Sequence, residues 1–150
     1  MAGAKTLEQR LDEAEARTAI TDLVHRYARF VRRDEPEHVS ALFTRDGTFE
    51  VRDGYPGRAE HTVRSHFASP AEIDTFMAAS KGKPHPVPLI HNLIVEIDGE
   101  IATGNCVMEA QIYGGTHKFC GEYRDTLRRE DGEWRFASRI YTIFSEAAAI

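Results

Sequence analysis

The stretch KPHPVPLIHNLIVEIDGEIATG, residues 83–104, decides the fold prediction. In its second half apolar side chains occupy every second position, which is typical of a strand with one buried face: Leu93, Val95 and Ile97. Asp98-Gly99 then makes a tight turn, so the stretch predicts a β-hairpin. Two histidines and three prolines precede that hairpin. Either these prolines merely shape a loop whose histidines are solvated, or they direct the imidazoles toward a cavity.

The alternating pattern continues almost to the end of the chain. Turn pairs separate the runs at Asp98-Gly99, Gly114-Gly115 and Asp131-Gly132, which predicts a four-stranded antiparallel meander. If Gly114-Gly115 is a two-residue turn, Cys106 lies opposite Tyr123, and Cys120 lies opposite Glu109. The two cysteines then lie on opposite faces of the sheet, too far apart to bridge, and we expect both to be reduced.

Pairing across the whole meander predicts one apolar face. A polar minority occupies adjacent rungs of that face: His91, Tyr123 and Asp125. Its neighbours include small residues that leave room between larger side chains: Gly104, Ala110 and Gly121. A gap lined by apolar groups with a few convergent polar ones is the usual ligand cavity.

The opposite face of the meander is predicted to be polar, and the same pairing places Arg139 on it. Its charges suit a subunit contact: Glu109, Glu122, Arg124, Arg128 and Arg135. We therefore expect a homo-oligomer in which this face is an interface.

The first half of the chain is predicted to be mainly helical. Apolar residues at helical spacing predict a helix from Leu7 to about residue 33, and DEPEHVSALF predicts a short second helix that ends near Thr44. The strand TFEVR, residues 48–52, follows the turn pair Asp46-Gly47. Ser69 begins a capping box with proline at the first helical position, which predicts a third helix that ends before Gly82. Helices followed by a sheet with one apolar face indicate an α+β fold.

Composition limits the function classes. The chain has 150 residues and a net charge of -5, which fits a single domain over residues 1–150 and argues against a nucleic-acid partner. No apolar run is long enough to span a membrane, and the N-terminal residues lack the apolar core of a signal peptide. We expect residues 1–6 to form a flexible tail and the protein to be cytoplasmic, without a membrane partner.

Three stretches resemble the SnoaL-like group of the nuclear-transport-factor-like cone fold: YARFVRRDEPEHVSALFTRDGTFEV, HNLIVEIDGEIATGNC and GEYRDTLRREDGEWRFASR. The group includes scytalone dehydratase, ketosteroid isomerase, limonene-epoxide hydrolase and hexachlorocyclohexane dehydrochlorinase. The resemblance implies a cone-shaped α+β barrel, with N-terminal helices packed on a strongly curved antiparallel sheet around one deep pocket. It also implies no metal and no organic cofactor, and a trimer rather than a dimer by analogy with the dehydratase-like members.

In the dehydratase-like members, an Asp–His pair with nearby tyrosines performs an acid/base elimination. Here the chain departs from the pattern, because the position of the family's aspartate corresponds to Arg32 and that of its histidine to Pro88. The nearest imidazoles are His85 and His91, three residues to either side of Pro88. The arginine of the dehydrochlorinase-type members corresponds to Arg139.

Five residues are candidates for the chemistry, each with a structural alternative. His91 and His85 are candidate general bases, against a hydrogen-bonded core histidine and a solvated loop histidine. Tyr27 and Tyr123 are candidate proton donors, against packed tyrosines with hydroxyls at a rim. Asp125 orients a histidine, or it holds Arg32 or Ser138 in a structural role.

Predicted substrate-binding residues include cations and large side chains: Arg32, Met108, Phe119, Trp134 and Arg139. The large side chains suit a ring, and Arg32 is either an anchor for an anion or a solvated cation at a helix end. The leading hypothesis is a cofactor-independent lyase that dehydrates a small hydroxylated, aromatic or cyclic molecule. A C–C lyase that releases a small aldehyde, an isomerase, an epoxide hydrolase and a non-catalytic binding domain are the alternatives.

Overall fold

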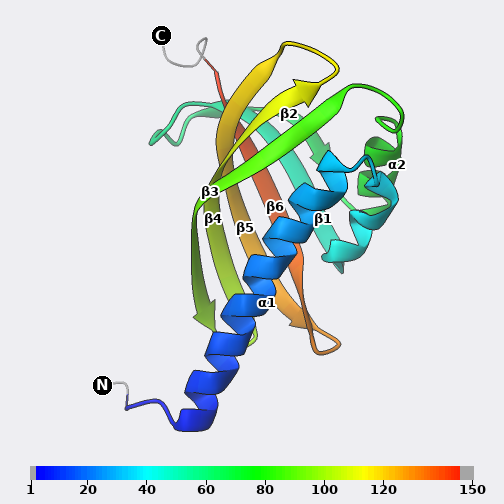
Figure 1. The fold of residues 1–150 in the computed structure, drawn as a ribbon. Helices are drawn as coiled ribbons and strands as arrows, with labels where there is room; N and C mark the ends of the chain where they lie inside the picture. The colour runs from blue at the N-terminus through cyan, green and yellow to red at the C-terminus, as the bar shows by residue number, and fades with distance from the viewer. Residues whose placement is uncertain (1–2, 146–150) are drawn as a thin grey trace.

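The computed structural model describes residues 3–145, which form helices against one six-stranded sheet (Figure 1). The helical elements are α1 (Leu7–Arg32), the 3-10 turns η1 (Pro36–His38) and η2 (Ser40–Leu42), and α2 (Pro70–Ala78). The strands are β1 (Phe43–Gly54), β2 (His61–Phe67), β3 (His85–Asp98), β4 (Ile101–Tyr113), β5 (Lys118–Glu130) and β6 (Glu133–Phe144). Of the predicted tail, residues 1–2 lie outside the described part, and Thr6 caps α1.

The sheet confirms the α+β prediction and corrects its details. Its strand order is β2-β1-β6-β5-β4-β3, so the last four strands form the predicted meander. The sheet is mixed rather than antiparallel, because β1 runs parallel to β6. It also does not close into a barrel, since β2 and β3 are its two edges. Strand β2 was not predicted, because most of its side chains are exposed and no apolar face marks it.

The register of β4 and β5 agrees with the predicted hairpin. Cys106 pairs with Tyr123 and Glu109 with Cys120, so the cysteines lie on opposite faces and both are free. The inward residues of these two strands are the predicted ones, because the alternation runs unbroken through both.

Two β-bulges reverse the alternation in the outer strands of the meander. In β3 the register shifts between His91 and Ile94, around Asn92, whose φ is 55°. In β6 it shifts beside Ala137, because Leu127 pairs with Phe136 while Thr126 pairs with Ser138. One extra residue sends every later side chain to the other face.

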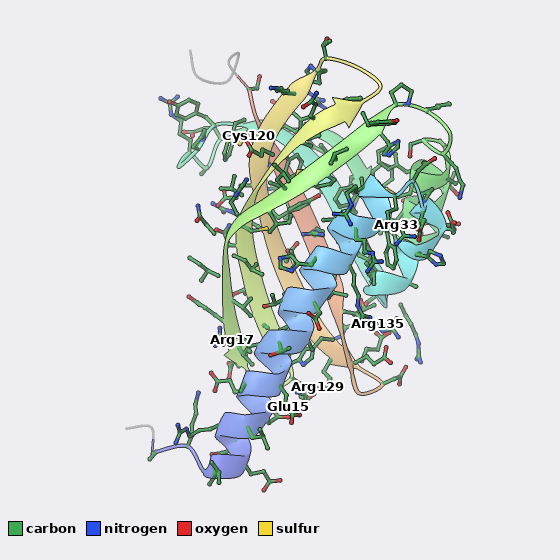
Figure 2. The ribbon with its side chains drawn as sticks, in the orientation of Figure 1. Glu15, Arg17, Arg33, Cys120, Arg129 and Arg135 are labelled. Carbon is green, nitrogen blue, oxygen red and sulfur yellow. The ribbon has the colours of Figure 1, made fainter. Side chains whose placement is uncertain are left out.

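Helix α1 packs its apolar stripe against the inner face of the sheet (Figure 1). Residues at helical spacing are buried along it: Ala16, Ile20, Leu23, Val24, Tyr27 and Ala28. Arg17 adds a polar tie, since its Nη1 donates to the carbonyl of Val95 on β3 at 2.5 Å (Figure 2). Within residues 3–145, no helix is long and apolar enough to cross a membrane.

Candidate functional site

A cavity of about 420 Å³ lies at the C-terminal end of α1, where η1, α2 and the inner face of the sheet meet. Most of its wall is apolar: Phe30, Val31, Pro36, Val39, Phe49, Val51, Phe76, Met77, Ala79, Pro86, Pro88, Met108, Phe119 and Ile143. The polar members of the wall are three tyrosines, Asp34, Ser80 and His85. Apolar walls with a few polar groups are the usual form of a small-molecule site. We call this space the tyrosine cavity.

The three tyrosines of the wall are Tyr27, Tyr123 and Tyr141. The rings of Tyr27 and Tyr123 meet edge to face at 6.0 Å, and those of Tyr123 and Tyr141 are 4.7 Å apart. The Tyr141 hydroxyl donates to the carbonyl oxygen of Met108 at 2.9 Å. These phenols therefore form one continuous polar strip on a largely apolar wall.

Burial keeps these phenols protonated. It raises the pKa of Tyr27 to about 12, although the Arg139 charge and a hydrogen bond with Tyr123 oppose the rise. Burial also raises the pKa of Tyr123 and of Tyr141 above the ordinary phenol value. At neutral pH Tyr27 and Tyr123 can donate hydrogen bonds or a proton to a ligand oxygen, whereas the Tyr141 hydroxyl already donates to Met108, and the strip does not supply a base.

The Tyr141 ring occupies the space that Gly121 leaves free by having no side chain. A Cβ at Gly121 would lie 2.7 Å from the Tyr141 hydroxyl and 2.2 Å from the carbonyl oxygen of Thr142, too close for any other residue. The room that the small residue leaves is thus filled by this ring. Tyr141 was not among the predicted site residues, because the bulge beside Ala137 reverses the facing of the second half of β6.

A buried ion pair lies beside the tyrosines. Arg139 and Asp125 are 0% and 3% exposed, and the guanidinium Nε donates to the Asp125 carboxylate at 3.0 Å. The Arg139 Cζ lies 3.6 Å from the ring centre of Tyr123, 4.2 Å from that of Tyr27 and 4.3 Å from that of Phe136. Because neither ionised residue belongs to the cavity wall, the aromatic rings separate the pair from a ligand.

Arg139 faces the interior, so its predicted position on the polar face is wrong. The sequence placed it on the polar side, and the bulge beside Ala137 turns it inward. Burial raises the pKa of Asp125 to about 6, even though Arg139 opposes the rise by its charge and its hydrogen bond. Asp125 is therefore placed to hold Arg139, rather than Arg32, Ser138 or a histidine.

His85 belongs to the cavity wall, but both of its ring nitrogens face backbone carbonyls. Nδ1 lies 3.0 Å from the oxygen of Lys83, and Nε2 lies 3.0 Å from that of Arg32. A neutral imidazole has one N–H, and an imidazolium donates to both oxygens. The ring thus ties the start of β3 to the end of α1, and in this geometry it has no nitrogen directed at a ligand.

His91 is not in the cavity, so its predicted inward position is wrong. It is exposed on the outer face, and its Nε2 lies 2.9 Å from the Glu109 carboxylate. The bulge at Asn92 is the cause, because it puts Pro88 and Ile90 on the inner face instead of His91.

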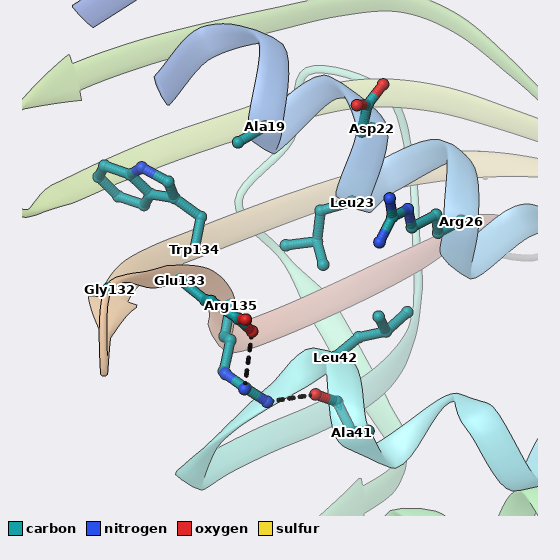
Figure 3. Close-up of a pocket in the computed structure, with 10 residues that line it drawn as sticks. All are labelled: Ala19, Asp22, Leu23, Arg26, Ala41, Leu42, Gly132, Glu133, Trp134 and Arg135. Atoms are coloured by element: carbon teal, nitrogen blue, oxygen red, sulfur yellow. Dashed lines mark hydrogen bonds and ion pairs between the residues drawn. The ribbon is translucent and has the colours of Figure 1, made fainter. Parts of the chain in front are cut away.

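Two predicted substrate-binding residues also lie elsewhere. Arg32 is exposed and is not part of the cavity wall. Its backbone carbonyl lies beside Nε2 of His85, which is a wall residue. Trp134 lines a separate groove of about 320 Å³ between α1, η2 and the β5–β6 turn (Figure 3). There Arg135 donates to the Ala41 carbonyl and pairs with Glu133. Met108 and Phe119 do line the tyrosine cavity.

Asp34 is a residue of the wall that was not among the predicted site residues. It follows α1 with φ 56°, in the left-handed region that aspartate tolerates better than most residues. Its Oδ2 accepts the amide N–H of Gly82 at 2.9 Å, which joins the end of α1 to the loop after α2. Asp34 lies two residues beyond Arg32, so a search at the family's aspartate position passes over it.

A family model described as a SnoaL-like domain matches residues 12–140. The chain belongs to the SnoaL-like family. No curated protein matches the sequence.

Three solved structures show the same fold as this SnoaL-like chain, all from Novosphingobium aromaticivorans. An NTF2-like protein with a cystatin-like fold has 23% identity and a TM-score of 0.70, covering 98% of this chain and 97% of its own. A candidate scytalone dehydratase has 18% identity and a TM-score of 0.69, with 93% and 89% covered. The β subunit of a candidate aromatic-ring-hydroxylating dioxygenase has 16% identity and a TM-score of 0.75, with 90% and 92% covered. These TM-scores show the shared fold, and at such low identity they show nothing of the activity, which is argued from the chain's own site.

Proposed function

We propose that this SnoaL-like protein is a cofactor-independent lyase of the dehydratase type, acting on a small hydroxylated ring compound in the tyrosine cavity. The observation that carries the proposal is the strip of three protonated phenols on an apolar wall of ring-sized dimensions. An apolar wall favours a ring, and phenols donate to its oxygen atoms.

Elimination of water needs one proton acceptor and one proton donor, and it is redox-neutral. The Asp34 carboxylate, the carboxylate of the cavity wall, takes a proton from the carbon next to the one that bears the leaving hydroxyl. The C–H electrons form the new double bond as the C–O bond breaks. Tyr27 or Tyr123 gives its proton to the departing oxygen, which leaves as water. The phenolate then recovers its proton from Asp34 through solvent, which restores both groups.

A panel of hydroxylated aromatic compounds, followed by ultraviolet absorbance, tests this proposal. Turnover of a compound should fall by about 100-fold or more in Tyr27→Phe or Tyr123→Phe, because the general acid is lost. Tyr113→Phe is the matched control, since this tyrosine is 69% exposed and lies outside the cavity. Equal rates in all three variants and in the wild type would refute the assignment. A different product from the same pocket would indicate C–C cleavage, isomerisation or epoxide hydrolysis instead.

A non-catalytic binding protein is the second candidate. It is favoured by the geometry of His85, whose nitrogens both face backbone carbonyls, together with Arg32 and Pro88 at the positions of the family's pair. Binding of panel compounds without any change in their absorbance or mass would select this candidate.

We also propose that the protein is a homo-oligomer, a trimer in preference to a dimer, with the outer sheet face as the contact. Ile94, which is 61% exposed, lies there in a shallow depression with Glu122, Arg124 and Ile140. An apolar centre within charges of both signs suits a contact between copies. Light scattering should give a multiple of the 16.9 kDa chain mass, and a monomer mass would refute the contact.

A further inference from the structure

We propose that Asp34 selects ligands of the tyrosine cavity by charge: the site takes ring compounds that present a hydroxyl or ammonium donor to Asp34, and rejects the carboxylate analogues. This inference rests on the proposed function in so far as both use the same cavity. It adds the class of ligand, and it assigns to Asp34 a part in binding that is measurable without turnover.

The Asp34 carboxylate has a fixed position in the cavity wall. Asp34 is half-buried in the wall, and the Gly82 amide holds one of its oxygens at 2.9 Å. Its backbone N–H donates to the carbonyl of Val31 at 3.2 Å, which fixes the turn that ends α1. The side chain is therefore held between two segments of the cavity rim and is not a freely rotating surface acid.

In the part of the chain that the structure describes, the rest of the cavity wall offers no cation to a ligand. The phenols are protonated, and most other side chains are apolar. His85 directs both nitrogens to backbone oxygens. The Arg139 guanidinium lies against the rings of Tyr27 and Tyr123, but Arg139 is not part of the wall and is paired with Asp125. No group of the described wall is thus directed to balance a ligand anion, and Asp34 would repel one.

Two cations adjoin Asp34 and its partner Gly82 in the chain, Arg33 and Lys81. Arg33 pairs with Glu35 at 2.7 Å just past α1, where Figure 2 labels it. Lys81 pairs with Glu37 at 3.0 Å. Both cations have carboxylate partners of their own, so neither is set to neutralise Asp34 or to attract a carboxylate ligand. Arg32, the predicted anchor for a ligand anion, is exposed and is not part of the cavity wall.

A matched ligand set tests the inference by calorimetry at pH 7. The probes are 4-hydroxybenzyl alcohol, 4-hydroxybenzylamine and 4-hydroxybenzoate, which share a phenol ring and differ in charge. The alcohol and the amine should bind the wild type at least ~10-fold more tightly than the benzoate. In Asp34→Asn the amine should weaken by ~10-fold, the benzoate should improve, and the alcohol should change little, because asparagine keeps a hydrogen-bonding oxygen.

Two control variants sharpen the result. Asp74→Asn makes the same substitution on the exposed side of α2, outside the wall, and should change none of the three affinities. Arg32→Gln should also leave the order of the ligands unchanged. Benzoate binding as tightly as the amine, or an Asp34→Asn variant with the wild-type order, would overturn the inference while leaving the cavity as the site. Failure of all three probes to bind the wild type would overturn the proposed function as well.

Discussion

Arg139 and Asp125 form an ion pair whose two side chains are both fully buried, a property that no other pair in residues 3–145 shares. Each charge loses its hydration, and the partner together with the ring faces of Tyr27, Tyr123 and Phe136 replaces part of it. Removal of one partner leaves an uncompensated charge inside the protein, whereas replacement of both by apolar groups removes the problem.

Arg139→Met should therefore lower the free energy of unfolding by roughly 3–5 kcal/mol, because Asp125 loses its partner. Urea unfolding at pH 7 measures the change. The double variant Arg139→Met/Asp125→Leu should recover most of the loss. Equal stability of Arg139→Met and the wild type would show that the pair does not carry this electrostatic role.

The pH dependence of stability should show the titration of Asp125. Burial raises its pKa from 3.8 to about 6, so the folded state binds the proton more tightly than the unfolded state does. The contribution of Asp125 to stability is fully present below its unfolded pKa and is lost as pH rises through about 6. Carboxyl carbon NMR should place its midpoint near 6, and a midpoint below 4 would contradict the direction of the shift.

Gly121→Ala should destabilise the fold by about 1–3 kcal/mol and displace Tyr141, because the new Cβ would overlap the Thr142 carbonyl at 2.2 Å. Gly104→Ala is the matched control on the same inner face, since its Cβ would make ordinary contacts from 3.5 Å outward. Thermal unfolding distinguishes the two variants. A Gly121→Ala variant as stable as the Gly104→Ala variant would show that the strand adjusts freely.

At the scale of elements, the two bulges separate what the sequence predicts from what it does not. Strands β4 and β5 alternate without a break, and their register follows from the turn at Gly114-Gly115 alone. In β3 the inward apolar positions change from even to odd numbers between Ile90 and Leu93, and an asparagine stands between them. That change of parity was a readable signal for the bulge that sends His91 outward.

Strand β6 offers a weaker signal. Its inward residues change from even to odd numbers beside Ala137. The next inward residue is a buried arginine, and from sequence alone an arginine in a strand is expected to face outward. The position of Arg139 depends on Asp125 and on aromatic rings from α1 and β5, which are contacts between distant segments. Such tertiary contacts override the local pattern, so the facing of Arg139 and Tyr141 required the structure.

Asn92 should be essential to the β3 bulge through its backbone. Its φ of 55° is tolerated by asparagine and glycine, and it is costly for a β-branched residue. Asn92→Gly should keep the stability within about 0.5 kcal/mol, whereas Asn92→Val should lose about 1–2 kcal/mol, measured by urea unfolding. Equal losses in the two variants would mean that the asparagine side chain, and not the backbone conformation, stabilises the bulge.

At the scale of the molecule, the resemblance in sequence correctly predicted the family, the α+β fold and the helices over the sheet. It predicted less of the site, because the family's pair of residues is replaced by Arg32 and Pro88. What the fold does supply is a cavity at the end of α1 where aromatic side chains from α1, β5 and β6 converge. The central claim is that a ring-bearing ligand occupies this cavity and contacts the strip of phenols.

The five tyrosines of the chain provide a direct test with built-in controls. Tyr27, Tyr123 and Tyr141 line the cavity, whereas Tyr55 and Tyr113 are 38% and 69% exposed and lie outside it. In protein labelled with ¹³C in the tyrosine rings, addition of 4-hydroxybenzyl alcohol should shift the ring signals of the three cavity tyrosines and leave those of Tyr55 and Tyr113 in place. Saturating ligand that shifts only the two exposed tyrosines, or none of the five, would contradict the account.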